Sequence, residues 1–424
     1  MLKSGSIVVI IVMLFVSPFI AQEKGDTTVI DLVEAIQKAE SNNFVIKSEQ
    51  YEKEAAEKNY KNQKTRELPN LSLLLFREDR FLSPYNFHQQ GASLHSSWEL
   101  GKLIVNNADV AKSESKIIEN RIAQEKLTAG RRVAGIYLRI LLAENEIKIQ
   151  LKRLELMKKH KAIAQIGWRA GTRSKLDVLQ SDNEITKIKE EIEKVKSKKE
   201  KLFTEFNLLV GNQRKYHLKS IDTEKIINLL LPDTSVLSVN GNPFITEYDF
   251  KTNTEILKKN AVASQQLPLI DFGGGFFNDA DPTGDGNYWQ VNIGLQLPLF
   301  MWGSTDYQRQ VSDAKIKSLK LQQINMQREL NIFYRKTFNE LGNYKTVAKI
   351  EKEREAIAEQ AFSIAQIDYE AGLITNLEFI DAQQSLAEIK IKMKTTRLKY
   401  IAKLIDLYLA ANRSDILFTM LKKF

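Results

Sequence analysis

Apolar residues recur every seven positions through the middle of the first half of the chain. Val133, Ile140, Ile147 and Leu154 keep this spacing among arginine, glutamate and lysine residues. A seven-residue apolar period is typical of coiled-coil helices. A continuous helix over 102–168 would extend about 100 Å at 1.5 Å per residue. The pattern therefore predicts helices longer than a single globular domain requires.

A second pattern, strict alternation, appears at residues 288–297. One face of this segment is apolar, with Trp289, Val291, Ile293, Leu295 and Leu297. Residues 91–98 alternate more weakly, and we expect partner strands at 71–78 and 270–278. About ten alternating residues with an aromatic near one end suit a lipid-facing barrel strand. A strand half-buried in a soluble sandwich has the same pattern, so alternation alone leaves both interpretations open.

The chain repeats itself about 200 residues along. Residues 168–181, with the sequence WRAGTRSKLDVLQS, realign on residues 369–382, with the sequence YEAGLITNLEFIDA. Leu68-Pro69, Asn42-Asn43-Phe44 and Leu100-Gly101 have counterparts at nearly the same offset in the second half. The mature chain is therefore expected to be two tandem copies of one unit, each with two strands, a very long helix, an Ala-Gly turn and a returning helix.

The N-terminus has the composition of an export signal. Lys3 is followed by an apolar run from Ile7 to Val16, then Ser17-Pro18 and a short segment that ends at Ala21. Ten apolar residues are fewer than the roughly 20 that a membrane-spanning helix needs. We predict a cleaved signal peptide over 1–21; a membrane anchor that stays attached is the alternative.

Composition excludes several classes of protein. The chain of 424 residues contains no cysteine, which removes disulfide frameworks, thiol enzymes and cysteine-ligated metals. Only 8 prolines are present, and none interrupts 85–231 or 300–424, so both stretches can hold long helices. The net charge of +9 is spread over many residues of both signs, which indicates solvated helix faces more than a nucleic-acid footprint.

Four predicted strands per chain cannot close a barrel, because the smallest outer-membrane barrels need eight. Beyond the N-terminal segment no apolar run is long enough for a transmembrane helix, so entry into a membrane would have to use strands. Closure then requires several identical chains in a cyclic oligomer, and three chains would supply twelve strands. The same rotation would gather the long helices around one axis.

Three further patterns in the sequence favour structural roles over chemical ones. The loop 279–287 has alternating oxygen-bearing side chains but Gln290 where a calcium loop has glutamate, so a hairpin loop is favoured. The four histidines lack ligand spacing, and Gly273–Gly275 precedes no helix, so neither a metal nor a phosphate site is expected. The sequence shows no set of a nucleophile, a general base and a residue that orients the base. We therefore expect neither an enzyme nor a cofactor. A periplasmic adaptor with one helical hairpin, or a soluble hydrolase or binding protein, are the alternatives.

This arrangement resembles the TolC outer-membrane efflux family through both copies. The most specific matches are the Ala-Gly turns with the segments that follow, Gly171–Leu179 and Gly372–Ile380, and the Leu-Pro-Leu-Phe segment within Leu297–Gly303. The resemblance implies a mainly α fold with transmembrane β: a trimer with a twelve-stranded outer-membrane barrel and a periplasmic helical barrel. It further implies a passive, gated channel of a tripartite efflux or type I secretion system in a Gram-negative envelope.

On this resemblance the chain divides into five parts. These are the signal peptide (1–21), a first repeat (22–210), an equatorial linker (211–241), a second repeat (242–411) and a C-terminal equatorial segment (412–424). The implied partners are two further copies of the chain, outer-membrane lipid, a periplasmic adaptor protein, and an inner-membrane efflux pump or ABC transporter. The cargo is not indicated by the sequence.

The two Ala-Gly turns resemble the periplasmic tips of the family. Ser174 and Thr375 are expected to cap the returning helices. Glu378 and Asp381 match the acidic rings of the closed entrance, and Asp177 and Tyr369 match an aspartate and a tyrosine that hydrogen-bond across neighbouring coils. The alternative is that the acidic residues merely complement the helix dipole.

One position departs from the family pattern. The gate arginine expected two residues after Gly372 is Ile374, whereas Arg173 occupies the corresponding place in the first copy. The charged part of the latch is therefore expected to differ. By resemblance alone, the turn residues Gly171, Thr172, Gly372 and Leu373 would contact the adaptor.

Overall fold

The computed structural model describes residues 28–82, 85–104, 107–211, 216–228, 241–280 and 286–423. The signal peptide predicted at 1–21 and most of the loop predicted at 279–287 lie outside these ranges, as do parts of the 211–241 linker. Within the described ranges, no helix has both the length and the apolar composition that crossing a bilayer requires.

The elements follow one another in an order that repeats in the two halves of the chain. The first half contains β1 (Thr28–Ile30), α1 (Leu32–Asn42), α2 (Phe44–Thr65), β2 (Ser72–Leu82), β3 (Tyr85–Glu99), α3 (Leu100–Ile104), α4 (Asn107–Arg169) and α5 (Lys175–Val210). The second contains β4 (Tyr216–Leu218), α6 (Thr223–Asn228), α7 (Pro243–Ala261), the 3₁₀ helix η2 (Val262–Gln266), β5 (Leu269–Ala280), β6 (Gly286–Gln296), α8 (Ser304–Ala371), α9 (Asn376–Ala410) and α10 (Ser414–Lys422).

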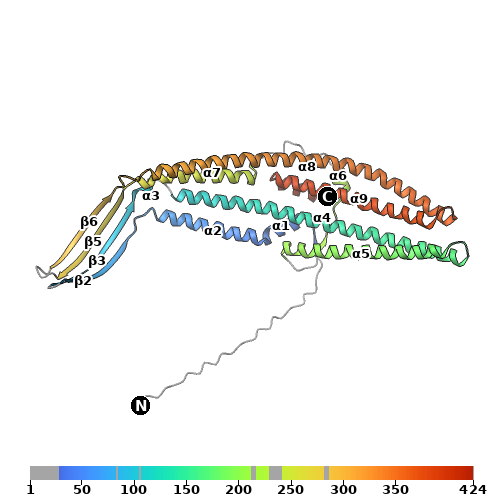
Figure 1. Ribbon diagram of the computed structural model, residues 1–424, viewed down its shortest axis with the longest axis horizontal. Coiled ribbons are helices and arrows are strands. Elements are labelled where there is room, and N and C mark those ends of the chain that lie inside the picture. The colour runs from blue at the N-terminus through green and yellow to red at the C-terminus, as the bar shows by residue number, and fades with distance from the viewer. Residues whose placement is uncertain are drawn as a thin grey trace, which may run out of the picture.

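The molecule is elongated, with its four-stranded sheet at one end and two helical turns at the other (Figure 1). The helices α4 and α8, of 63 and 68 residues, run most of this length. The shorter helix α2 packs along α4, and α7 packs against both α4 and α8, so the half of the molecule nearer the sheet is also built of paired helices (Figure 1). The predicted long helices are therefore confirmed.

The sheet is an antiparallel meander in the order β2-β3-β5-β6. All four predicted strands are present, although β3 extends well beyond the alternating segment 91–98. Its outer part pairs with charged positions of β2, for example His88 opposite Asp79, where no apolar alternation marks a strand. One face presents exposed apolar side chains in register, among them Leu75, Phe276 and Trp289.

The tandem repeat is visible in matching side-chain contacts. The Asn42 side-chain amide donates to the carbonyl oxygen of Val210 at 2.6 Å, and the Asn242 side-chain amide donates to that of Ala410 at 2.5 Å. Each asparagine thereby ties the first helix of its repeat to the end of the returning helix. The two-repeat prediction is confirmed, and the chain has two helical hairpins, α4–α5 and α8–α9, rather than the one that the adaptor alternative requires.

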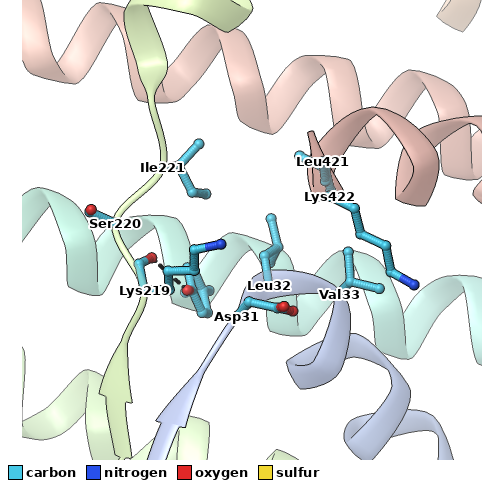
Figure 2. Close-up of a pocket in the computed structure, with 9 residues that line it drawn as sticks. Asp31, Leu32, Val33, Lys219, Ser220, Ile221, Leu421 and Lys422 are labelled. Atoms are coloured by element: carbon cyan, nitrogen blue, oxygen red, sulfur yellow. Dashed lines mark hydrogen bonds between the residues drawn. The ribbon is translucent and has the colours of Figure 1, made fainter. Parts of the chain in front are cut away.

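The main hydrophobic core lies midway along the helices. Here β1 pairs in parallel with β4, and the hydroxyl of the buried Tyr137 lies 3.1 Å from the carbonyl oxygen of Ile30 and 2.7 Å from that of Lys219. Figure 2 shows the chain at Lys219 beside the start of α1, with Leu421 of α10 facing them. The strand β1, the described residues 216–221 and the helix α10 thus lie together beside α4.

Candidate functional site at the helical tip

The two helical hairpins end in turns of the same construction. Gly171 and Gly372 have φ angles of 75° and 79°, a left-handed conformation that side chains other than glycine rarely adopt. The backbone N–H of Thr172 donates to the Gly167 carbonyl, and that of Leu373 donates to the Asp368 carbonyl, each at 2.8 Å. These bonds close the last turn of α4 and α8. Thr172 and Leu373 are left exposed at the extreme end of the molecule.

Each returning helix begins with a capping box. The Ser174 hydroxyl accepts from the Asp177 N–H while the Asp177 carboxylate accepts from the Ser174 N–H, and Thr375 and Glu378 make the same pair of bonds. Such reciprocal caps satisfy backbone donors that would otherwise lack partners. The expected caps are confirmed, and both carboxylates have a structural role in helix initiation.

Glu378 remains charged and solvent-exposed in this role. Its Oε2 lies 2.7 Å from the Thr375 nitrogen and 2.8 Å from Thr375 Oγ1, and these hydrogen bonds lower the pKa of its carboxyl group. Asp381 is exposed one helical turn further along α9, whereas Phe379 and Ile380 are buried. The two acidic side chains therefore share the solvent-facing side of the helix.

Tyr369 lies buried between the hairpins, with 1% of its surface exposed. Its hydroxyl has no hydrogen-bond partner among the described residues. The hydrogen bond to Asp177 that the family resemblance implies is thus not formed within the chain, where Asp177 is engaged by its own cap. Burial raises the pKa of the Tyr369 hydroxyl, which keeps it protonated and able to donate.

Arg173 is the residue that joins the two turns. Its guanidinium donates to the backbone carbonyl of Tyr369 and lies over the Tyr369 ring, 4.1 Å from the centroid. The side chain reaches this position across Gly167, where a Cβ would overlap its methylene groups. Ile374, which replaces the expected arginine, packs against the apolar cluster beneath the turns. An arginine from the first copy therefore makes the charged contact to the second.

A buried polar cluster next to Tyr369 was missed by the sequence analysis. The side-chain oxygen of Asn376 lies 2.6 Å from Nε2 of His160 and 3.2 Å from the hydroxyl of Ser181, and its amide donates to Gln180 at 2.9 Å. Asn376 begins α9, whereas the other three residues belong to the α4–α5 hairpin. The cluster therefore fixes the relative position of the two hairpins.

His160 is also held by aromatic stacking. Its ring lies parallel to that of Phe379 at a centroid distance of 3.8 Å, and 4.2 Å from the Tyr369 ring. A signal was available in the sequence, because Met157, His160 and Ala164 share one helix face and the two neighbours are apolar. That spacing places the histidine on the buried side of α4.

Acidification should loosen this contact. Burial lowers the pKa of His160 below its ordinary value of 6.5. The hydrogen bond that Nε2 donates to the Asn376 side-chain oxygen opposes this shift, and the charge of Arg173 adds to it. The imidazole of His160 binds a proton more readily once it is exposed, so the stability of the packed contact between the hairpins falls as the pH drops below about 6.5. Relative to a cysteine at an exposed position of the same tip, a cysteine at the buried Ser181 should react with a maleimide several-fold faster at pH 5.5 than at pH 7.5.

The rate should be referred to that of a cysteine at the exposed Thr172, which corrects for the reagent's own pH dependence. Because the chain contains no cysteine, each variant carries a single thiol. Adding His160→Phe should abolish the pH dependence. An unchanged pH dependence in that background would show that another group controls the contact.

Several solved structures have the same fold. A membrane protein from Pseudomonas aeruginosa superposes with a TM-score of 0.75 at 17% identity, and the match covers 91% of each chain. The Campylobacter jejuni CmeC outer membrane channel gives 0.74 at 15% identity, covering 90% of this chain and 85% of that one. The open state of the Neisseria gonorrhoeae MtrE outer membrane channel gives 0.75 at 15% identity, covering 90% and 88%.

The family is shown by a family model and not by an individual curated relative. Comparison with curated protein sequences produced no significant match. The family model described as outer membrane efflux protein, however, matches residues 35–209 and 258–413, one segment in each repeat. These segments include both helical hairpins and both tip turns. The chain therefore belongs to the outer membrane efflux protein family, whose members are channels rather than enzymes.

Proposed function

We propose that this protein is the outer membrane channel of a tripartite efflux or type I secretion system, a passive conduit with a gated acidic entrance at the periplasmic tip. The observation that carries the proposal is the placement of one four-stranded sheet, apolar on one face, at the opposite end from the two capped turns. A sheet with an apolar face suits the outer membrane, and paired helices of about 100 Å can reach across the periplasm.

A homotrimer follows from the unpaired surfaces of the single chain. Among the strands that the structure describes, β2 and β6 each pair on one side only, which leaves both edges of the sheet free. Three copies joined edge to edge would make a twelve-stranded barrel without edges. A further unpaired surface is the exposed stripe on α8, whose spacing suits a helix of a neighbouring copy: Ile350, Ile357, Ile364 and Ile367.

The tip turns are the proposed contact with a periplasmic adaptor. Gly171, Thr172, Gly372 and Leu373 lie at the extreme end of the hairpins, and the Leu373 side chain is 75% exposed. An exposed leucine on a capped, rigid turn is a suitable anchor for a protein partner. An inner-membrane pump or ABC transporter would supply the energy and the cargo.

The proposed boundaries follow the same reasoning. The segment 1–21 is the export signal, 22–210 and 242–411 are the repeats, and 211–241 and 412–424 form the equatorial belt. The belt is supported by the pairing of β1 with β4 and by the contact of α10 with the start of α1.

Purified mature protein tests the channel assignment. Added to planar lipid bilayers, it should give discrete conductance steps, and native mass measurement in detergent should give three chains per particle. A monomer, or a trimer that never conducts, would contradict the proposal.

Removing the acidic charge at the entrance should weaken block by polyvalent cations. In Glu378→Gln with Asp381→Asn, the glutamine can still cap Thr375, so the change removes charge while preserving the helix start. Block by a trivalent cation added on the periplasmic side should weaken about tenfold, because rings of carboxylates attract and hold cations. Glu353→Gln, an exposed change further up α8, is the matched control. Equal block in the two variants would remove Glu378 and Asp381 from the entrance.

A further inference from the structure

Three aromatic side chains form a row across the polar face of the sheet. The strand register places Phe76 opposite Gly91, Gly91 opposite Phe277, and Phe277 opposite Tyr288. Successive residues of a strand point to opposite faces, so these four positions share one face. We call Phe76, Phe277 and Tyr288 the inner aromatic row.

The row is a packed arrangement. The Phe76 and Phe277 rings lie 5.7 Å apart between centroids, and the Phe277 and Tyr288 rings stack at 5.4 Å. The two phenylalanines meet above Gly91, where a Cβ would lie 2.8 Å from Cδ1 of Phe277 and 3.1 Å from Cε1 of Phe76. The Tyr288 hydroxyl accepts a hydrogen bond from the side chain of Gln89 at 3.3 Å. A glycine at the centre is therefore what allows the rings to pack.

Lipid contact does not explain this row. The lipid-facing aromatic residues of the same strands, Phe276 and Trp289, lie on the opposite face, each next in sequence to a member of the row. Apart from Leu74, the neighbouring positions on the face of the inner aromatic row are polar, among them Ser93, His95 and Asn292. Three large aromatic side chains on a polar face thus need a different role.

Negative charge lies beside the aromatic rings. Glu78 and Asp279 occupy the next row toward the β2–β3 and β5–β6 turns, on the same face. Arg80 pairs with Glu78 at 2.8 Å. The two carboxylates and this one guanidinium together give this part of the sheet one net negative charge in each copy. Aromatic faces attract cations, and a nearby carboxylate adds to that attraction.

We propose that the inner aromatic row, with Glu78 and Asp279, is a binding site in the channel lumen for hydrophobic organic cations. This inference rests on the proposed function, since only a closed barrel turns this face toward a lumen. Three copies of the chain would place nine aromatic rings around the passage. The site names the cargo class that the channel favours: cations that carry aromatic groups.

Block of single channels by tetraphenylphosphonium tests the site. In planar bilayers, tetraphenylphosphonium added on the side of the β-hairpin turns should block the wild-type channel, and the variant with Phe76→Leu, Phe277→Leu and Tyr288→Leu should bind it about tenfold more weakly. Tetraethylammonium, which has the same charge but no aromatic ring, should block both channels equally weakly. Phe277→Leu alone, a milder change, should weaken tetraphenylphosphonium block by about twofold to threefold.

The neighbouring lipid-facing residue provides the control. Phe276→Leu removes an aromatic ring from the same strand on the other face and should leave tetraphenylphosphonium block unchanged. Conducting channels whose block is the same in the wild type and the triple variant would overturn the inference and leave the channel assignment intact. Wild-type protein that gives no conductance would overturn both.

Discussion

Arg173→Ala should open the tip and raise the resting conductance of the channel severalfold. The guanidinium of Arg173 donates to the Tyr369 carbonyl and covers the Tyr369 ring, and it is the only described cation that does either. A hydrogen bond from a charged donor contributes about 2 kcal/mol. Loss of this hydrogen bond would shift the proposed balance between closed and open tips by roughly thirtyfold per chain. Single-channel recording in planar bilayers measures this directly.

Arg169→Ala is the matched control. Arg169 ends α4 four residues earlier, is exposed, and has the same charge. If both alanine variants change the conductance equally, the effect comes from lost surface charge and the Arg173 contact does not hold the tip closed.

Tyr369→Phe tests whether contacts within one chain or contacts between neighbouring chains hold the tip closed. The hydroxyl has no hydrogen-bond partner in the described part of the chain, so we expect its removal to change the conductance only if the oligomer supplies an acceptor from a neighbouring copy. The contrast between Tyr369→Phe and Arg173→Ala therefore shows whether the closed state is held mainly within one chain or between chains.

The long helices and the sheet could be predicted because their signals are local. A seven-residue apolar period marks α4, and a two-residue alternation marks β6, each within one element. The tandem offset then supplied the order of elements in the second half from that in the first. Pairing of β3 with β5 joins the two halves, and the sequence pattern did not predict which strands of the two hairpins would meet.

The contacts between the hairpins could not be predicted in the same way. Arg173 and Tyr369 are almost 200 residues apart, and their contact depends on the rotation of α8 about its axis relative to the first turn. The partner of His160 depends on the same rotation. A residue pattern gives the buried face of one helix but not the residue that meets it from another hairpin.

The acidic residues show a further limit. The spacing between Thr375 and Glu378 predicts a cap, whereas the entrance ring is implied by the family resemblance alone; the structure shows the cap. A carboxylate that initiates a helix can still face the axis of an oligomer. Glu378→Gln removes the charge but preserves the cap, so this substitution distinguishes the role in the entrance from the role in starting the helix.

Arg153→Ala should destabilise the part of the helical bundle between the main core and the tip turns by about 3–5 kcal/mol. Arg153 of α4 is 5% exposed and forms an ion pair with Glu184 of α5, which is 8% exposed. Its second nitrogen lies 3.4 Å from Glu191, and its backbone carbonyl accepts from Gln383 of α9. Removing the guanidinium leaves the buried Glu184 carboxylate with only the more distant Lys187, 3.6 Å away.

The loss is large because a buried charge without its partner is costly, even where the intact pair adds little to stability. Chemical denaturation in detergent, followed by circular dichroism, measures the change in the free energy of unfolding. Lys152→Ala removes the neighbouring cation, whose exposed pair with Glu155 is worth about 0–1 kcal/mol. Replacing both partners, with Arg153→Met and Glu184→Leu, should restore most of the stability. A single Arg153→Ala variant as stable as Lys152→Ala would mean that Glu184 gains solvent or another cation when Arg153 is removed.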